Sequence, residues 1–351
     1  MRFLITGGAG FIGSNAARRF RELGHGVVVF DSFVRAASRF NRAWLESVHP
    51  DVRFIEGDVR DAEGLRSVLE QPFDVVLHLA GQVAVTTSIL DPATDHDVNA
   101  LGTFKLLEEL RRRHAGAPDR APLLIYASTN KVYGDTPNRL PLESLEKRLE
   151  LPESHRYFRG IDTSMSIDSS THSLFGVSKA AADLLVQEYG RYFEMPTVCF
   201  RGGCLTGPQH AGAKLHGFLA YLMKCTVTGT PYTVFGYGGK QVRDNIHSAD
   251  LVACFQAYQR NPRPAAVYNM GGGRRSNCSM LEAIDVCERV AGRELEWTLS
   301  DENRIGDHRW WISDVSDFAA DYPDWQPRFG IEEILREMYE QNVERWMATA
   351  G

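Results

Sequence analysis

The sequence predicts an α/β protein built around a doubly wound parallel sheet. Short, nearly continuous apolar runs recur along roughly the first 200 residues, and helix-length segments separate them. Such runs are typical of parallel strands that helices cover on both faces of a sheet. The first run leads directly into a glycine-rich loop, which is the order of elements that a nucleotide site requires.

The predicted strands follow one another along the chain at helix-length intervals. The first covers residues 1–6, and after the glycine loop a helix-compatible stretch extends to residue 23. Further apolar runs predict strands within 27–31, 52–55, 75–81, 123–127 and 197–200. We therefore expect about six strands in one doubly wound sheet.

A change in composition near residue 206 predicts a second, smaller lobe. Gly and Pro become denser there, and the predicted helices become shorter. We expect a cofactor-binding domain at 1–205 and 239–263. The smaller C-terminal lobe, which would bind the substrate, is predicted at 206–238 and 264–351.

Composition excludes several classes of protein. The 351 residues include 39 Lys and Arg against 45 Asp and Glu, a formal net charge of −6, so we expect no nucleic-acid partner. No apolar run reaches the roughly 18–20 residues of a membrane span, and the start lacks a signal-peptide pattern. A cytosolic protein without a membrane partner is expected. The six Cys lack a CxxC spacing, so we predict no metal.

Gly7, Gly10 and Gly13 follow the first strand at three-residue spacing and predict a pyrophosphate site. Glycines permit a tight turn there and let backbone N–H groups approach the anion at a helix N-terminus. Asp31 ends the second predicted strand, where its carboxylate would accept hydrogen bonds from a ribose and repel a 2′-phosphate. The predicted cofactor is therefore NAD rather than NADP. We interpret Arg35, which could contact a 2′-phosphate, as a solvated arginine.

Several motifs together resemble the extended short-chain dehydrogenase/reductases, the family of nucleotide-sugar epimerases and dehydratases. They are Thr6–Gly13, Gly57-Asp58-Val59, His78–Gly81, Asn99–Thr103, Ser128-Thr129 before Val132-Tyr133-Gly134, Gly176–Lys179, Arg201 before Gly207-Pro208, and Arg243-Asp244. The segments Gln82–Ser88 and Ser128–Asp135 look most similar to the CDP-tyvelose (CDP-paratose) 2-epimerase branch. The resemblance implies a Rossmann-type fold and a homodimer through helices around 104–112 and 179–191.

The resemblance also implies a fuller set of binding residues. NAD would contact Gly7, Gly10, Phe11, Ile12, Gly13, Asp31, Asp58, Val59, Leu79, Ala80, Gly81, Asn99 and Lys179. The nucleotide sugar would contact Gln82, Thr129, Asn130, Arg243, Arg304 and Asp307. Arg243 and Arg304 are similar to family positions that hold the diphosphate, which suits the bidentate guanidinium, and Asp307 is available to the nucleotide ribose.

The catalytic positions depart from the family in one place. In the enzymes that the chain resembles, a Tyr-x-x-x-Lys pair and a Ser or Thr line the nicotinamide, and the tyrosinate takes the sugar hydroxyl proton. Thr129 and Lys179 match, but Phe175 stands in the tyrosine position. Since a phenyl ring has no proton to exchange, another group must do so in an active enzyme. Lys131, Lys179 itself and Cys204 are the candidates, in that order of preference.

The residues after Thr129 favour epimerisation over dehydration. Sugar dehydratases of this family carry an Asp-Glu pair there, whereas this sequence has Asn130 and Lys131. The leading prediction is an NAD-dependent nucleotide-sugar epimerase, most specifically one that inverts C2 of a CDP- or other NDP-hexose by transient oxidation. Two alternatives stay open. One is an NDP-sugar dehydratase with atypical acid/base residues, and the other is a catalytically silent protein that binds NAD and a nucleotide sugar.

Overall fold

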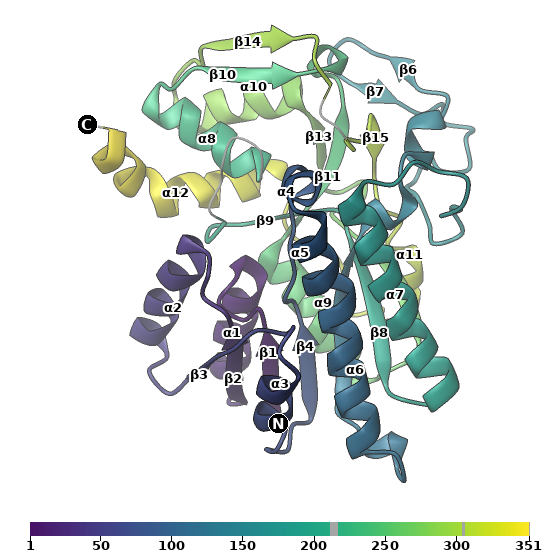
Figure 1. The fold of residues 1–351 in the computed structure, drawn as a ribbon. Coiled ribbons are helices and arrows are strands. Elements are labelled where there is room, and N and C mark those ends of the chain that lie inside the picture. Colours follow the sequence, from purple (N-terminus) through teal and green to yellow (C-terminus); the bar gives the residue numbers. More distant parts are fainter. Residues whose placement is uncertain (211–216, 304–305, 351) are drawn as a thin grey trace. The chain divides into compact units, whose positions relative to one another are not determined.

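The structure is a computed structural model, and it describes residues 1–210, 217–303 and 306–350. Its contacts divide the chain into two compact units, and Figure 1 shows the elements of each. The first unit comprises Met1–Val132, His172–Arg201 and Val252–Tyr268. The second unit comprises Tyr133–Thr171, Gly202–Leu251 and Asn269–Gly351.

A seven-stranded sheet organises the first unit, in the order β12-β8-β5-β4-β1-β2-β3. Its strands are β1 (Arg2–Thr6), β2 (Gly26–Asp31), β3 (Arg53–Glu56), β4 (Val75–His78), β5 (Leu123–Thr129), β8 (Thr197–Gly202) and β12 (Ala266–Met270). The pairs β3–β2, β2–β1, β1–β4 and β4–β5 are parallel. The winding reverses between β1 and β4, and ligands of such folds bind at the carboxyl ends of the strands beside that point.

The sheet confirms the predicted α/β class and the six predicted strands. The seventh strand, β12, lies in a segment that the sequence analysis assigned to the smaller lobe. It is an edge strand, beside β8. Its apolar run is short and begins only after the turn at Ala265, whose φ is +58°. Composition alone gave no signal that the chain returns to the first sheet there.

Helices cover both faces of the seven-stranded sheet. They are α1 (Phe11–Glu22), α2 (Ala36–Val48), α3 (Ala62–Val68), α4 (Val85–Leu90), α5 (Pro92–His96), the π-helix η1 (Asp97–Leu101), α6 (Gly102–Arg113), η2 (Pro118–Arg120), η3 (Asn130–Tyr133), α7 (Leu174–Phe193) and α9 (Ser248–Arg260). Figure 1 shows α6 and α7 side by side, in agreement with their contacts. Phe20 of α1 stacks on Phe3 of β1 at 4.1 Å, and Phe200 of β8 packs on Phe255 of α9.

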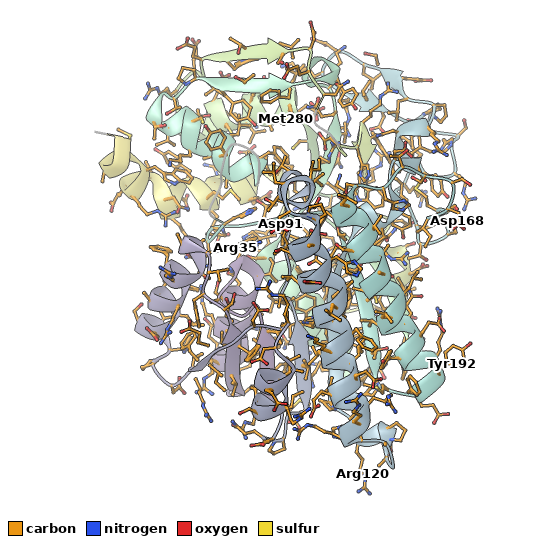
Figure 2. The ribbon with its side chains drawn as sticks, viewed as in Figure 1. Arg35, Asp91, Arg120, Asp168, Tyr192 and Met280 are labelled. Carbon is orange, nitrogen blue, oxygen red and sulfur yellow. The ribbon has the colours of Figure 1, made fainter. Side chains whose placement is uncertain are left out.

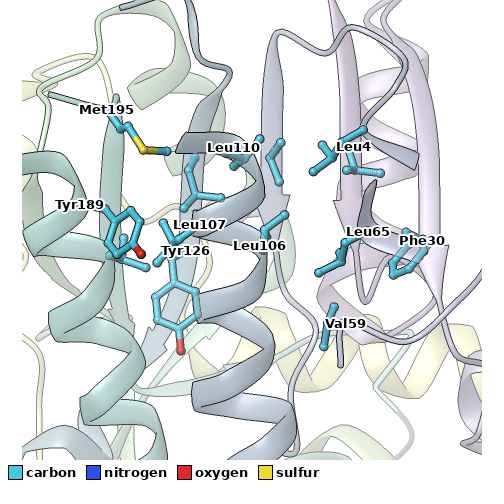
Figure 3. Packing of buried hydrophobic residues seen from close by; sticks show 14 of the residues in the cluster. Leu4, Phe30, Val59, Leu65, Leu106, Leu107, Leu110, Tyr126, Tyr189 and Met195 are labelled. Carbon is cyan, nitrogen blue, oxygen red and sulfur yellow. The ribbon is translucent and has the colours of Figure 1, made fainter. Parts of the chain in front are cut away.

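The hydrophobic core on the α3, α6 and α7 face, which we call the first-unit core, is shown in Figure 3. Its labelled members are Leu4, Phe30, Val59, Leu65, Leu106, Leu107, Leu110, Tyr126, Tyr189 and Met195. Leu4 points to this face, whereas its neighbours Phe3 and Ile5 point to the other, as the alternation of side chains along a strand requires. The continuous burial of the strands thus explains their unbroken apolar runs.

The second unit contains three small sheets and a helical layer. Its strands are β6 (Glu143–Ser144), β7 (Leu149–Glu150), β9 (Cys204–Thr206), β10 (Tyr232–Phe235), β11 (Val242–His247), β13 (Asn277–Ser279), β14 (Trp297–Ser300) and β15 (Trp310–Trp311). Its helices are η4 (Thr136–Arg139), α8 (Phe218–Thr228), η5 (Tyr237–Gly239), α10 (Met280–Ala291), α11 (Ser316–Asp321) and α12 (Ile331–Ala350). β11 pairs with β13, β15 and β9, and α8, α10 and α12 pack on one another.

The compact units and the predicted domains differ at residues 202–205, at residues 264–268 of the β12 segment, and in two longer segments. Residues 133–171 were expected in the cofactor domain, but they belong to the second unit, where Glu150 binds Arg274 at 2.8 Å and Ile161 bridges to Ser313. Residues 239–251 were also expected in the cofactor domain. They contain β11 and the first residues of α9; within the described ranges β11 pairs with β9, β13 and β15 of the second unit, and the chain joins the first unit from residue 252.

Membrane-spanning helices are absent from the part of the chain that the structure describes, because none of its helices is both long and apolar enough.

Candidate functional site

Two glycines at the β1–α1 junction, one in the loop and one in the first turn of α1, have no space for side chains. Gly7 has a φ of +67°, and a Cβ atom there would lie 2.6 Å from the backbone N of Ala80. A Cβ atom on Gly13 would lie 2.4 Å from the carbonyl O of Gly7. Gly10 is the N-cap of α1, and no side chain in the described ranges caps this helix. The N–H groups of the first helical turn and the helix dipole therefore fit a pyrophosphate.

The Asp31 carboxylate is held beside this loop. One oxygen, Oδ2, accepts a hydrogen bond from the backbone N of Ala9 at 3.0 Å, and Oδ1 accepts one from the backbone N of Phe33 at 3.0 Å. Because a carboxylate oxygen accepts about two hydrogen bonds, both oxygens keep capacity for a ribose diol. Arg35, labelled in Figure 2, is exposed and donates to the carbonyl O of Gly81 at 3.4 Å.

Asp58 and Val59 follow β3 but use their side chains within the protein. The Asp58 carboxylate accepts hydrogen bonds from Arg60 at 2.7 and 3.0 Å, and this pairing lowers the pKa of Asp58. Val59 is buried in the first-unit core, and a Cβ atom on Gly102 would lie 2.8 Å from its Cγ2. Any contact of Val59 with a cofactor would therefore use its backbone.

The residues after β4 form a network of internal hydrogen bonds. The backbone N of Gln82 donates to Asn99 Oδ1 at 2.9 Å, and Gln82 Nε2 donates to the carbonyl O of Ala84 at 2.8 Å. Gln82 Oε1 accepts a hydrogen bond from the backbone N of Ala84. The Gln82 amide is thus engaged by partners within the protein, and binding a substrate would require it to exchange partners. Its predicted role in substrate binding stays a prediction.

His78, at the end of β4, makes hydrogen bonds beside the same loop. Its Nδ1 lies 2.6 Å from Thr6 Oγ1 and its Nε2 lies 2.9 Å from Thr103 Oγ1. Thr103 Oγ1 donates to the carbonyl O of Asn99, so Nε2 must donate to Thr103, and Nδ1 must accept from Thr6. Burial lowers the pKa of His78 to about 3, which keeps the ring neutral. Sequence reasoning assigned His78 no role, because its partners come from separate segments.

Lys179 is buried on α7. Its Nζ donates to the carbonyl O of Ala127 at 2.8 Å and lies 4.3 Å from the centre of the Tyr126 ring. Burial lowers the pKa of Lys179 to about 8, although the carboxylates of Asp183 and Asp95 favour its charged form. Near neutral pH this side chain therefore exists as both ammonium and amine.

Phe175 precedes Lys179 by one helical turn and is also buried. Residues at this spacing lie on one face of a helix, so both side chains belong to the same side of α7. Ser173 caps the helix by accepting a hydrogen bond from the backbone N of Gly176 at 3.0 Å. The backbone N of Phe175 donates to Ser88 Oγ at 3.1 Å. These contacts fix the start of the helix independently of what stands at position 175.

Thr129, Asn130 and Lys131 lie at the junction of β5 and η3. Thr129 Oγ1 accepts a hydrogen bond from the backbone N of Lys131 at 3.2 Å and donates a long one to Asn130 Oδ1 at 3.4 Å. A Cβ atom on Gly176 would lie 2.8 Å from the carbonyl O of Lys131. The backbone of this junction therefore packs on the first turn of α7, one residue after Phe175.

In the second unit, β11 brings two predicted substrate residues together. Arg243 Nη2 donates to Asp307 Oδ1 at 2.5 Å, and Arg243 Nη1 donates to the carbonyl O of Val242 at 2.7 Å. The Arg243 side chain is buried, whereas Asp307 is partly exposed. Arg304, the other predicted diphosphate ligand, lies outside the described residues.

Cys204 lies on β9, the neighbour of β11 within the second unit. It pairs with Asn245, which follows Arg243 by two residues along β11. Since alternate residues of a strand share a face, Cys204 and Arg243 lie on the same face of this sheet. The thiol is partly buried.

Sequence reasoning also missed a buried ion pair close to Lys179. Asp183 accepts hydrogen bonds from Arg201 at 2.8 and 3.1 Å and one from Ser128 Oγ at 2.5 Å. Asp183 follows Lys179 by one turn of α7, while Ser128 and Arg201 come from β5 and β8. Charged and hydroxyl donors satisfy the carboxylate, as a buried ion pair requires. In the sequence, Asp183 stands among apolar residues of an amphipathic helix, and this setting could have indicated a buried carboxylate.

The glycine loop, the parallel sheet and Asp31 define a dinucleotide-binding enzyme of the doubly wound α/β class. The sequence pattern of the NAD dependent epimerase/dehydratase family matches residues 3–271, and the chain belongs to that family. This result confirms the predicted family and, through the family, NAD as the cofactor.

Known proteins extend the match over nearly the whole chain. The CDP-paratose 2-epimerase of Salmonella typhi is 31% identical, over 97% of this chain and 98% of its own length. The dTDP-glucose 4,6-dehydratase of Escherichia coli is 27% identical, over 97% of this chain and 92% of its own length. The Thermus thermophilus UDP-glucose 4-epimerase, solved with NAD, superposes with a TM-score of 0.76 at 25% identity, over 97% of this chain and 98% of its own. The chain is thus similar to both epimerases and dehydratases of nucleotide sugars.

Proposed function

We propose that the protein is an NAD-dependent nucleotide-sugar epimerase that inverts C2 of a CDP- or other NDP-hexose. The observation that carries the proposal is the pair Asn130 and Lys131 after Thr129, in a chain that is 31% identical to a CDP-paratose 2-epimerase. Neither side chain is a carboxylic acid, so this junction lacks the acid and base that eliminate water in the related dehydratases. Redox epimerisation requires only hydride transfer and one proton shuttle.

The glycine loop, Asp31 and Lys179 would hold the cofactor, and bound NAD would accept the hydride from the sugar and return it. The N-terminus of α1 would bind its pyrophosphate, because Gly7 and Gly13 keep that space free of side chains. Asp31 would bind the adenosine ribose through lone pairs that Ala9 and Phe33 leave free. The Lys179 ammonium, oriented by Ala127, would donate its remaining protons to the nicotinamide ribose.

The hydroxyl proton of the sugar would pass through a group other than residue 175. Thr129 would orient the hydroxyl, since its own proton makes only a 3.4 Å hydrogen bond. Lys131, Lys179 and Cys204 remain the proposed carriers. The pKa of about 8 at Lys179 supports a role for this amine at mildly alkaline pH.

Arg243 would bind the diphosphate of the substrate together with Arg304. Arg243 has a buried guanidinium whose present partner, Asp307, is a carboxylate. A phosphate oxygen has the same charge and acceptor geometry, so the substrate would replace or share this partner. Asp307 would then turn to the nucleotide ribose.

We also propose the homodimer that the family resemblance implies. Apolar side chains remain exposed along α6 and α7, at Phe104, Leu174, Val177 and Leu184. On α7 these positions follow a helical spacing of three and seven residues, which places them on one stripe. Sedimentation should give the mass of a dimer, and Phe104→Glu with Leu184→Glu should give a monomer.

The predicted cytosolic location stays a prediction.

Incubation with a panel of nucleotide hexoses tests the function. With NAD present, mass spectrometry after separation of sugar isomers should show a product of unchanged mass and changed retention. A product lighter by one water would favour the dehydratase alternative. If the protein binds a nucleotide hexose but leaves all of them unchanged, the silent binding protein is favoured.

A further inference from the structure

Asp95 on α5 is a buried carboxylate to which none of the steps above gives a role. Its side chain is 1% exposed, and burial raises its pKa. Three side chains from three different elements donate hydrogen bonds to it. Ser178 Oγ donates to Asp95 Oδ2 at 2.5 Å, while Gln82 Nε2 and Asn99 Nδ2 donate to Asp95 Oδ1 at 3.0 and 3.3 Å.

The donors connect Asp95 to the parts of the first unit that would bind cofactor and sugar. Gln82 belongs to the loop after β4, Asn99 to the π-helix η1, and Ser178 directly precedes Lys179 on α7. Asn99 Nδ2 also donates to Ser178 Oγ at 3.1 Å, and Asn99 Oδ1 accepts the backbone N–H of Gln82. Asp95 is therefore the common acceptor that joins this loop to α7.

The charge of Asp95 also acts on Lys179. Five titratable groups surround the Lys179 ammonium from the elements packed against it: Asp95 of α5, His78 of β4, Tyr126 of β5, Asp183 of α7 and Cys199 of β8. Burial keeps His78, Tyr126 and Cys199 uncharged around neutral pH, because it lowers the pKa of His78 and raises those of Tyr126 and Cys199. The favourable charges near Lys179 are thus Asp95 and Asp183.

We propose that Asp95 is a positioning residue of the site, which fixes α7 against the loop of Gln82 and holds Lys179 in its charged form for the cofactor ribose. The part that concerns the cofactor rests on the proposed function. The positioning role of Asp95 and the effect of its charge can be separated, because Asn at position 95 can make the same hydrogen bonds. An amide oxygen would accept from Gln82 and Asn99, and its NH2 group would donate to Ser178 Oγ. Ser178 can then donate to the carbonyl O of Phe175, which lies 3.1 Å away.

Asp95→Asn therefore removes the charge while keeping the geometry, and Asp95→Ala removes both. Ser178→Ala keeps the charge and removes the contacts of Ser178 Oγ with Asp95, Asn99 and the carbonyl O of Phe175. The matched control is Asp91→Asn, four residues earlier, where an exposed carboxylate caps α5 through the backbone N of Thr94 (Figure 2). Asn is itself a good N-cap, so this control also keeps its local structure.

The experiment titrates Lys179 in the free protein by NMR of lysine labelled with ¹³C at Cε, with Lys179→Arg to assign the signal. Asp95→Asn should lower the pKa of Lys179, whereas Ser178→Ala and Asp91→Asn should leave it unchanged. Calorimetric NAD titrations should show Asp95→Asn binding about threefold or more weakly at pH 8.5 and within about twofold of the parent at pH 6.5. Asp95→Ala should bind NAD more weakly at both pH values.

An unchanged Lys179 titration in Asp95→Asn would overturn the proposal, as would equal losses of NAD affinity in Asp95→Asn and Asp91→Asn. If Asp95→Ala fails to fold, Asp95→Asn and Ser178→Ala still decide the question. Because the lysine titration needs no nucleotide sugar, its outcome is independent of turnover. A shifted titration in a protein without epimerase activity would reject the proposed function and retain this electrostatic role of Asp95.

Discussion

Phe175 and Lys179 lie one turn apart on the same face of α7, and both are buried. The lysine is held by a 2.8 Å hydrogen bond to the carbonyl O of Ala127, so its position does not depend on a phenol at residue 175. We therefore predict that NAD binding does not require a phenol at residue 175. On this interpretation, position 175 differs from the family pattern in the proton carrier alone.

The first prediction concerns restoration of that phenol. If the site only lacks a proton carrier, Phe175→Tyr should raise turnover by about 10²-fold or more, which is the usual contribution of a general base. Initial rates on the accepted nucleotide sugar measure this, and Phe193→Tyr, at the far end of α7, is the matched control. Unchanged turnover together with loss of activity in Lys131→Met would show a site rebuilt around another base. If Phe175→Tyr, Lys131→Met and Cys204→Ser each leave the turnover unchanged, both the missing carrier and the replacement base are contradicted.

The second prediction concerns the choice of cofactor. Because the Asp31 carboxylate lies beside the glycine loop, NAD should bind at least about tenfold more tightly than NADP, which corresponds to about 1.4 kcal/mol. Asp31→Asn should reduce the preference for NAD over NADP. Asp58→Asn should preserve that preference, since the Asp58 carboxylate pairs with Arg60 in the parent protein. Calorimetric titration of both cofactors gives the ratio. Equal or reversed affinities in the parent protein would remove the assignment of Asp31.

The third prediction concerns the diphosphate. Replacing Arg243 by Ala should weaken nucleotide-sugar binding by about 1.5–3 kcal/mol through loss of charged hydrogen bonds, and NAD binding should not change. Arg309→Ala, on the same unit with its guanidinium over the Tyr237 ring, is the control and should have little effect. A parallel loss of NAD affinity in Arg243→Ala would instead indicate structural damage.

The fourth prediction concerns acid stability. His78 has a folded-state pKa of about 3 against an ordinary value of 6.5, so between these values the unfolded chain binds a proton that the folded chain does not. Stability should therefore fall as pH falls through 6.5 towards 3, by up to about 5 kcal/mol from this group. His78→Gln should be less stable at pH 7 but lose less stability on acidification. Urea unfolding across this pH range measures the difference, and parallel stability curves for the parent protein and His78→Gln would contradict a neutral, buried His78.

The sequence predicts the parallel sheet better than it predicts the strands of the second unit. The buried strands β1, β2, β4 and β5 are unbroken apolar runs, and the glycine loop identifies the strand that meets the cofactor. In contrast, β11 reads as a mixed polar strand, and its pairing with β13 and β15 arises from segments far apart in the chain. The 239–251 segment was misplaced for that reason.

Side-chain networks were harder to predict than motifs. Gln82 and Asn99 were identified from the family resemblance, but their common acceptor, Asp95, was not, since a single Asp between Pro92 and Asn99 has no distinctive spacing. Likewise Arg243 and Asp307 were each selected, yet their ion pair depends on a contact between residues 64 positions apart. Such relations follow from tertiary packing rather than from local pattern.

Transient oxidation at C2 is tested most directly by following the sugar in deuterated water. The NAD-loaded protein is incubated with a CDP-hexose that it binds, and the product is examined by NMR. We expect a sugar inverted at C2 whose C2 carries protium, because the hydride that leaves the carbon returns to it. A dehydrated product, or a C2 epimer that carries solvent deuterium at C2, would contradict transient oxidation at C2.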